Sequence, residues 1–198
     1  MRSRKRGRYE GAVIVRRLLA IALILSVLAG GLVVIAWRTA RADPDVRRVS
    51  VVLPGWPAGT APMTVALLSD LHVGNSAMEA GRLARIVDQV NAQHPDLVVI
   101  AGDFIAGHAP ADAAAAPQLA SLAALRPRWG TIAVLGNHDY WTDAERVRTT
   151  LRAAGITELA NGAVRRGPLT IGGLDGQPTH HARLPGTLGR CGDWVAYR

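Results

Sequence analysis

The sequence predicts an α/β domain with parallel strands, preceded by one long apolar helix. Three apolar runs each end in a cluster of polar residues, and these clusters begin at residues 70, 103 and 137. Separations of 33 and 34 residues are about the length of one strand–helix–strand unit. Because the carboxyl ends of parallel strands meet at one edge of a sheet, we expect the three clusters to converge there. The apolar helix is predicted by twenty consecutive residues without charge near the N-terminus.

The net charge of +8 is confined to the start of the chain. The first 42 residues hold nine of the 23 Lys and Arg but one of the 15 acidic residues, so the remaining chain carries 14 of each. A surface that binds nucleic-acid phosphates needs an excess of positive charge, and we therefore expect no nucleic-acid partner. The single cysteine, Cys191, excludes an internal disulfide and a zinc site built from several cysteines.

The N-terminal segment is predicted to be a membrane anchor. Residues 1–17 form a basic leader, and the uncharged residues 18–37 would span a bilayer core as a helix. Seven positive charges precede this segment and four follow it, which predicts a cytoplasmic N-terminus and a periplasmic or extracellular domain. We favour an uncleaved signal anchor in the cell (inner) membrane. Cleavage after Ala42 and twin-arginine export through Arg16–Arg17 are the open alternatives.

The elements between residues 38 and 154 follow from apolar periodicity and turn residues. Residues 38–62 form a proline-containing connector, in which the β-like run Val49–Leu53 is expected to add an edge strand. An amphipathic helix is predicted over Glu79–Gln93, because Leu83, Ile86, Val87 and Val90 recur at helical spacing. The core strands are predicted at Met63–Leu68, Leu97–Ile100 and Thr131–Leu135, and two further helices at Gln118–Leu125 and Thr142–Ala154, the latter capped by Thr142 or Asp143.

The last part of the chain has weaker signals. Short strands separated by turn residues are predicted at Ile156–Leu159, Ala163–Arg166 and Leu169–Ile171. Beyond Leu174 we find no strand or helix period, so residues 175–198 are predicted to form an irregular tail.

The residue types in the three clusters are those that bind metal ions. Asp70 and His72 lie two apart at a strand end, so both can hold one cation, and the two oxygens of Asp103 can bridge it to a second. Asn137 offers a neutral carbonyl oxygen. Oxygen and imidazole ligands without thiolates suit manganese, iron or zinc, and two such ions are the usual device for activating a water in phosphoester hydrolysis. His138 would then stabilise developing charge or protonate the leaving oxygen.

Three motifs carry a resemblance to a known family. Asp70-Leu71-His72, Gly102-Asp103 and Gly136-Asn137-His138-Asp139, in this order, resemble the first three blocks of the calcineurin-like metallophosphoesterases, and specifically a bacterial membrane-anchored branch. The resemblance covers residues 63–174 and implies an α/β sandwich of two sheets flanked by helices. It implies that Asp70, His72 and Asp103 bind one divalent metal and that Asp103 and Asn137 bind the other. His138 would be the catalytic histidine, oriented by Asp139.

The resemblance also implies later blocks that this sequence does not show. Family members continue to a strand ending in a metal-binding histidine and then to a glycine-histidine-x-histidine block, so we expect an incomplete sandwich and a site with weak turnover. We expect His180-His181, between two prolines, to be loop residues rather than ligands. His108, five residues after Asp103, is likewise expected to lie outside the site.

We therefore expect a membrane-anchored, two-metal phosphoesterase that acts on phosphomonoesters or phosphodiesters. The alternative is a truncated, catalytically inactive fragment that serves as a membrane-tethered binding module. The substrate stays open between nucleotide, lipid headgroup and other phosphoesters, because substrate choice is made by loops. The oligomeric state also stays open.

Overall fold

The computed structural model describes residues 2–175 and 183–191, and the chain forms two compact units, Met1–Ala42 and Asp43–Arg198. The first unit is one helix, α1 (Arg2–Ala40), of 39 residues. Its segment Val15–Ala40 contains 18 consecutive residues with a mean hydropathy of 2.9, none of them buried, so by length and composition it can cross a membrane. The predicted span of residues 18–37 lies within this segment.

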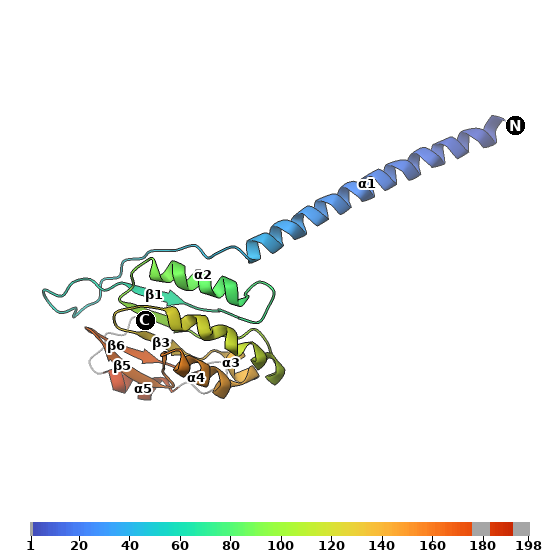
Figure 1. Ribbon diagram of the computed structural model, residues 1–198. Helices are drawn as coiled ribbons and strands as arrows, with labels where there is room; N and C mark the ends of the chain where they lie inside the picture. Colours follow the sequence, from blue (N-terminus) through green and yellow to red (C-terminus); the bar gives the residue numbers. More distant parts are fainter. Residues whose placement is uncertain (1, 176–182, 192–198) are drawn as a thin grey trace. The chain divides into compact units, whose positions relative to one another are not determined.

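The second unit is built on a parallel sheet of four strands, drawn in Figure 1, in the order β1-β2-β3-β4. The strands are β1 (Val65–Leu68), β2 (Leu97–Ala101), β3 (Thr131–Val134) and β4 (Thr157–Glu158). Leu68 pairs with Ile100, and Ala101 pairs with Val134, so the carboxyl ends of the first three strands lie at one edge. The predicted parallel arrangement of these three strands is confirmed.

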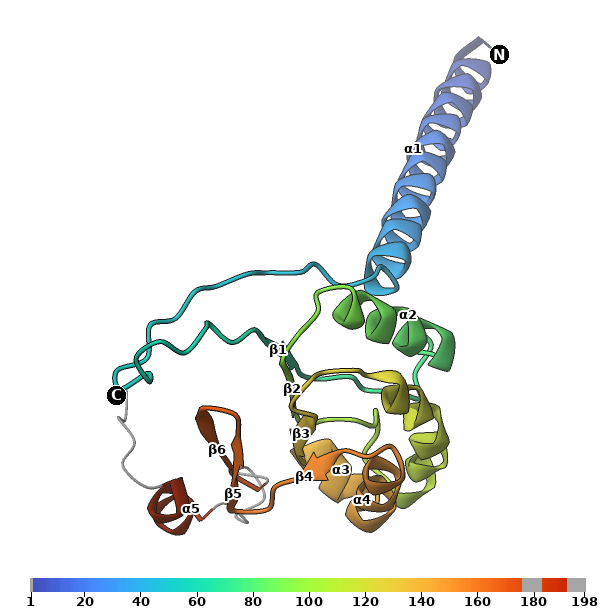
Figure 2. The same cartoon turned by 60° about the vertical axis from the view of Figure 1, so that its left-hand side comes forward.

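Helices cover one face of this sheet, as Figure 2 shows. They are α2 (Ala80–Asn91), the 3-10 helix η1 (Pro110–Ala124), α3 (Asn137–Thr142) and α4 (Ala144–Ala153). Their apolar stripes pack on the sheet and make the main core, whose fully buried helical side chains include Leu83, Val87, Leu119, Leu122, Val147 and Leu151. Burying this apolar surface is what holds the helices against the strands.

A smaller layer covers the other face of the sheet (Figure 2). It contains the antiparallel hairpin β5 (Gly162–Arg166) and β6 (Leu169–Gly173), and helix α5 (Leu184–Cys191). A second core of Leu97, Ile132 and Leu159 lies here, with Val164 and Ile171 of the hairpin packed against it. The cover ends before β1, where Leu67 is 70% exposed. The predicted α/β class, with two sheets and flanking helices, is confirmed.

Between residues 49 and 125 one predicted strand is wrong, and one predicted helix is present but starts earlier than expected. The run Val49–Leu53 is not a strand, and Val52 is 88% exposed, because β-propensity alone makes no strand where no neighbouring strand supplies hydrogen bonds. The helix predicted at Gln118–Leu125 begins earlier, at Pro110, and runs through Pro117 as a 3-10 helix. Proline at the first helical position is favourable. Two of the alanines that follow, Ala113 and Ala116, are buried in the core.

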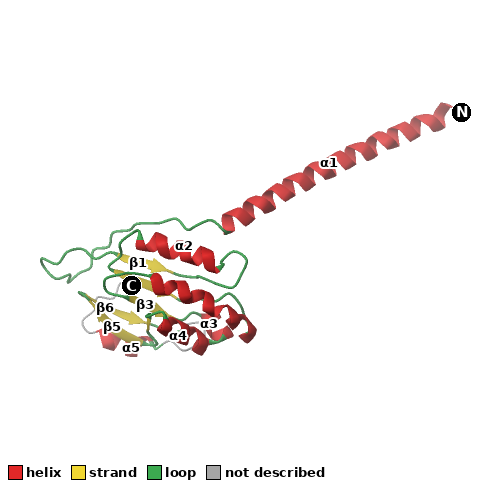
Figure 3. Ribbon diagram, in the orientation of Figure 1, coloured by secondary structure: helices red, strands yellow, loops and turns green. Residues whose placement is uncertain are grey.

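Two helices were not predicted, and Figure 3 shows both among the helices in red. Helix α3 (Asn137–Thr142) begins at the polar motif after β3, where no helix was predicted, and the carboxylate of Asp139 accepts a hydrogen bond from the N–H of Gly136 and caps the first turn. Helix α5 lies in the tail that was predicted to be irregular. It packs on the β5–β6 hairpin and buries Thr187, whose hydroxyl donates to the carbonyl of Arg183. Tertiary packing thus outweighs the two glycines in this helix.

Candidate metal centre

The segments that follow β1 and β2 run side by side beyond the strands. The N–H of Asp70 donates to the carbonyl of Gly102 (3.2 Å), and the N–H of His72 donates to the carbonyl of Asp103 (2.9 Å). The N–H of Val73 continues the series to Phe104 (2.8 Å). These backbone bonds place the first two polar clusters against each other, as the sequence predicts.

Three candidate ligands have a left-handed backbone. The φ angles are 54° for Asp70, 46° for His72 and 57° for Asp103. For a residue with a side chain this conformation costs roughly 1–2 kcal/mol. Such strain persists only where surrounding contacts fix the backbone, and it gathers at functional sites. Here the backbone bonds between the two segments fix it, and they hold His72 Nε2 3.6 Å from Asp70 Oδ1 and 3.9 Å from Asp103 Oδ2.

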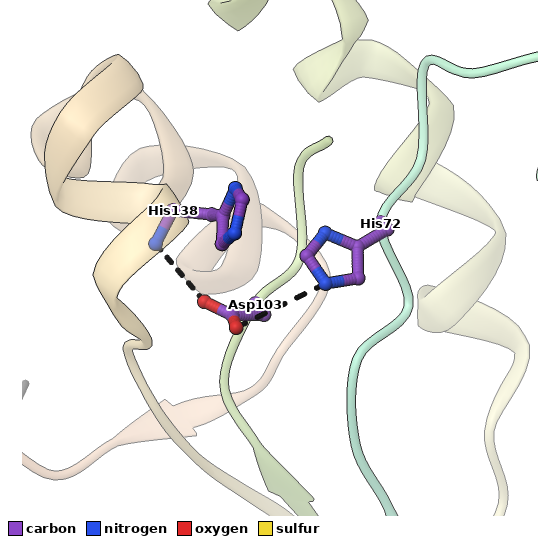
Figure 4. Close-up of side chains that lie close together, drawn as sticks. All are labelled: His72, Asp103 and His138. Carbon is purple, nitrogen blue, oxygen red and sulfur yellow. Dashed lines mark hydrogen bonds and ion pairs between the residues drawn. The ribbon is translucent and has the colours of Figure 1, made fainter. Parts of the chain in front are cut away.

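Figure 4 shows the centre of this site, formed by His72, Asp103 and His138. One ligand atom from each side chain lies within 4.8 Å of the other two. The His72 Nε2 to Asp103 Oδ2 distance is 3.9 Å, and the two imidazole rings meet edge to face with centroids 4.7 Å apart. Metal–ligand bonds of about 2.0–2.2 Å put two ligands of one ion up to about 4.4 Å apart, so His72 Nε2 and Asp103 Oδ2 already lie within reach of one divalent ion.

Asp103 is the central residue of the site. Its Oδ2 faces His72, while its Oδ1 accepts a hydrogen bond from the backbone N–H of His138 (3.0 Å). The strand ends approach so closely that a Cβ on Gly136 would lie 2.1 Å from Asp103 Oδ1, and a Cβ on Gly102 would lie 2.6 Å from the Gly136 nitrogen. Glycine at both positions is therefore what brings the second and third clusters together.

Asp70 and Asn137 lie beside this centre. Asp70 Oδ1 is 3.6 Å from His72 Nε2, but the Asp70 side chain is 64% exposed and is not one of the three clustered residues. The hydroxyl of Ser69 donates to the Asp70 carboxylate. Asn137 is half-buried and is the first residue of α3, directly before His138.

Asp139 differs from the prediction that it orients His138. Its side chain is fully buried, and its two oxygens accept four backbone N–H bonds of 2.8–3.2 Å. The donors are Asp103, Phe104, Ile105 and Gly136. Burial raises the pKa of the Asp139 carboxyl above its usual value, although the backbone donors act in the opposite direction. Asp139 therefore ties the two loops of the site together.

The ring of His138 is oriented by a backbone carbonyl instead. His138 Nδ1 lies 2.8 Å from the carbonyl oxygen of Gly107. A carbonyl can only accept, so Nδ1 carries the proton and Nε2 is left as the nitrogen available to the site. The contact to the ring is thus made by Gly107, 31 residues away along the chain, and a role of Asp139 in orienting His138 stays a prediction.

Two aromatic side chains at the site were missed. The His108 ring lies 4.7 Å from the His138 ring, and Trp141 lies 4.9 Å from His138 and 5.2 Å from His108 between centroids. The expectation that His108 lies away from the site is therefore wrong in position. Trp141 is three residues after His138, a spacing that shares one helix face, but this signal needed α3 to be recognised as a helix.

A polar network holds α3 from behind. The Tyr140 hydroxyl donates to Asp175 Oδ1 (2.5 Å), and Arg148 donates to the Tyr140 oxygen (2.8 Å) and to Glu145 (2.7 Å). Burial, together with the hydrogen bond to Asp175, raises the pKa of Tyr140 to about 12. The network joins α3 and α4 to the segment after β6.

Carboxylates and imidazoles that converge at the carboxyl edge of a parallel sheet are the donors of a candidate divalent-metal site. The model of the calcineurin-like phosphoesterase family matches residues 63–183, and the chain belongs to this family. The predicted resemblance to this family is thus confirmed, whereas the bacterial membrane-anchored branch stays a prediction, and members of the family normally bind two divalent metals. His180-His181 lie outside the described residues.

Several proteins of similar sequence are named as metallophosphoesterases. A transmembrane protein with metallophosphoesterase domain from Danio rerio is 31% identical over 151 residues, which is 72% of this chain and 34% of that protein. Its namesake from Bos taurus is 32% identical over 161 residues, 80% of this chain and 35% of that protein. An uncharacterized metallophosphoesterase of Bacillus subtilis is 28% identical over 152 residues, 73% of this chain and 55% of that protein. The chain thus spans about a third of the two vertebrate relatives.

Proposed function

We propose that this domain hydrolyses phosphomonoesters or phosphodiesters with two divalent ions, manganese, iron or zinc. The observation that carries the proposal is the convergence of His72, Asp103 and His138 at the sheet edge. Asp70, His72 and Asp103 would hold one ion, and Asp103 and Asn137 the other. When bound, such ions neutralise phosphoryl charge and lower the pKa of water.

The side chains of this site have distinct parts in that reaction. The two oxygens of Asp103 face different neighbours, which suits a carboxylate shared between two ions. His138 is fixed through Nδ1, so its Nε2, when protonated, is the atom that would donate a hydrogen bond to a phosphoryl oxygen or a proton to the leaving oxygen. Asp139 takes no part in proton transfer in this proposal, because its oxygens are occupied by backbone donors.

The test is metal binding followed by turnover. The full chain in detergent is titrated with Mn²⁺ by calorimetry and then assayed on bis-p-nitrophenyl phosphate. Asp103→Ala is expected to lose more Mn²⁺ than Asp70→Ala, because Asp103 contacts both halves of the site. Asp88→Ala, which removes an exposed carboxylate on α2, is the control. Equal Mn²⁺ binding by Asp103→Ala and the parent would refute the site, and Mn²⁺ binding without hydrolysis would favour the binding-module alternative.

We also propose that α1 anchors the domain in the cell membrane with the domain outside. Support comes from the apolar segment Val15–Ala40, from the excess of positive charge before it, and from two relatives named transmembrane proteins. A phosphatase reporter fused after Asp43 should be active because it is exported, and a fluorescent protein fused there should stay dark. The reverse pattern would refute the orientation. A mature N-terminus at Asp43 would replace the anchor with a cleaved signal peptide.

A further inference from the structure

Two exposed aromatic rings stand beside the metal centre. Trp141 leaves 45% of its surface exposed, and His108 is also exposed. Their rings are stacked, with centroids 5.2 Å apart and planes inclined by 30°, and both rings contact His138. A large aromatic side chain is normally well buried, so an exposed Trp next to reactive groups is the informative exception.

Both rings are held in fixed positions. The N–H groups of His108 and Ala109 donate to Asp112 Oδ2 at 3.0 and 3.1 Å, which anchors the loop to the first turn of η1. The preceding residue, Gly107, binds His138 through its carbonyl. Trp141 lies on α3, whose end is fastened by the Thr142 hydroxyl to the His138 carbonyl (2.9 Å). A ligand would therefore meet a surface that is already ordered, so ordering it costs little on binding.

We propose that His108 and Trp141 form a stacking wall for a planar aromatic or heteroaromatic group of the phosphoester. The inference rests on the proposed function, because the phosphoryl group is taken to lie at the cluster of His72, Asp103 and His138. A ring joined to that phosphorus through an ester oxygen would emerge beside His138, which both wall residues contact. Every aromatic ring or nucleobase has a π face that can stack, whereas an alkyl chain has none.

The experiment compares ligands that share a phosphoryl head. The Mn²⁺-loaded full chain is titrated with phenylphosphonate and with methylphosphonate. The phenyl compound is expected to bind about three- to tenfold more tightly, the range of one aromatic contact. Trp141→Leu should bring the ratio of the two dissociation constants close to one, and Trp141→Phe should retain most of it. Trp56→Leu, in the connector, is the matched control and should leave the ratio unchanged.

A second ligand pair identifies the ring. Adenosine 5′-monophosphate is compared with ribose 5-phosphate as a competitor of phenylphosphonate. A preference for the adenine compound that Trp141→Leu abolishes assigns the wall to nucleobases, and a preference for phenylphosphonate alone assigns it to simple aryl esters.

The possible results distinguish failure of the stacking wall from failure of the proposed metal site. Normal Mn²⁺ binding with equal affinities for phenyl- and methylphosphonate would overturn the stacking wall and leave the metal site standing. A preference that survives in Trp141→Leu would overturn it as well. Absence of Mn²⁺ binding by the parent chain would refute the metal site and this inference together.

Discussion

Removing the carboxylate of Asp139 should destabilise the domain more than any single surface change. Asp139→Ala leaves four backbone N–H groups without their acceptor, and two of them, on Phe104 and Ile105, are buried. A buried donor without a partner costs about 1–3 kcal/mol. The other two donors are on half-buried residues that water can reach, and the cost of burying the carboxylate is relieved. The net loss should be about 3–5 kcal/mol.

The variant Asp139→Asn separates the contributions of the two carboxylate oxygens to this loss of stability. Asp139→Asn keeps one oxygen for Phe104 and Ile105 but places an amide group against the N–H groups of Asp103 and Gly136. It should lose about 1–2 kcal/mol. Asp143→Ala is the control, because Asp143 caps α4 through one hydrogen bond, to the N–H of Arg146, and such a cap contributes about 1 kcal/mol.

Urea denaturation of the full chain in mild detergent, followed by near-ultraviolet circular dichroism, measures these losses. Asp139→Ala should unfold at the lowest urea concentration, followed by Asp139→Asn. If Asp139→Ala costs no more than the Asp143→Ala control, the carboxylate does not tie the loops together. If both Asp139 variants keep full stability but lose hydrolysis, the residue acts on His138 after all.

Two further predictions concern the close approach of the strands and the network behind α3. Gly136→Ala should abolish Mn²⁺ binding measured by calorimetry, because its Cβ would lie 2.1 Å from Asp103 Oδ1; normal binding would show that the loops can separate. The pKa of Tyr140, raised to about 12, means that the folded state keeps its phenol proton after the unfolded chain has lost it. Stability should therefore fall as the pH rises from 10 to 12, and Tyr140→Phe should reduce this fall in urea titrations.

The sequence by itself determined the fold class and the convergence of the three clusters. Apolar runs that end in polar residues at the spacing of one strand–helix–strand unit leave few other arrangements, because parallel strands bring their carboxyl ends to one edge. The spacing predicted that the segments of Asp70, His72 and Asp103 lie side by side, as they do, and the sequence also predicted the start of the family match at residue 63 and the apolar segment of α1. These features are encoded in local composition and periodicity.

Tertiary structure alone decided how the site residues contact one another. Three of the four bonds to Asp139, the Gly107 carbonyl on His138 and the ring contact between His108 and His138 depend on left-handed loop residues and on close approach between segments 30 to 36 residues apart. No sequence period reports such contacts. The run Val49–Leu53 is an example in which local sequence predicted a strand that does not form. Its β-branched residues would form a strand only where a neighbouring strand offers hydrogen bonds.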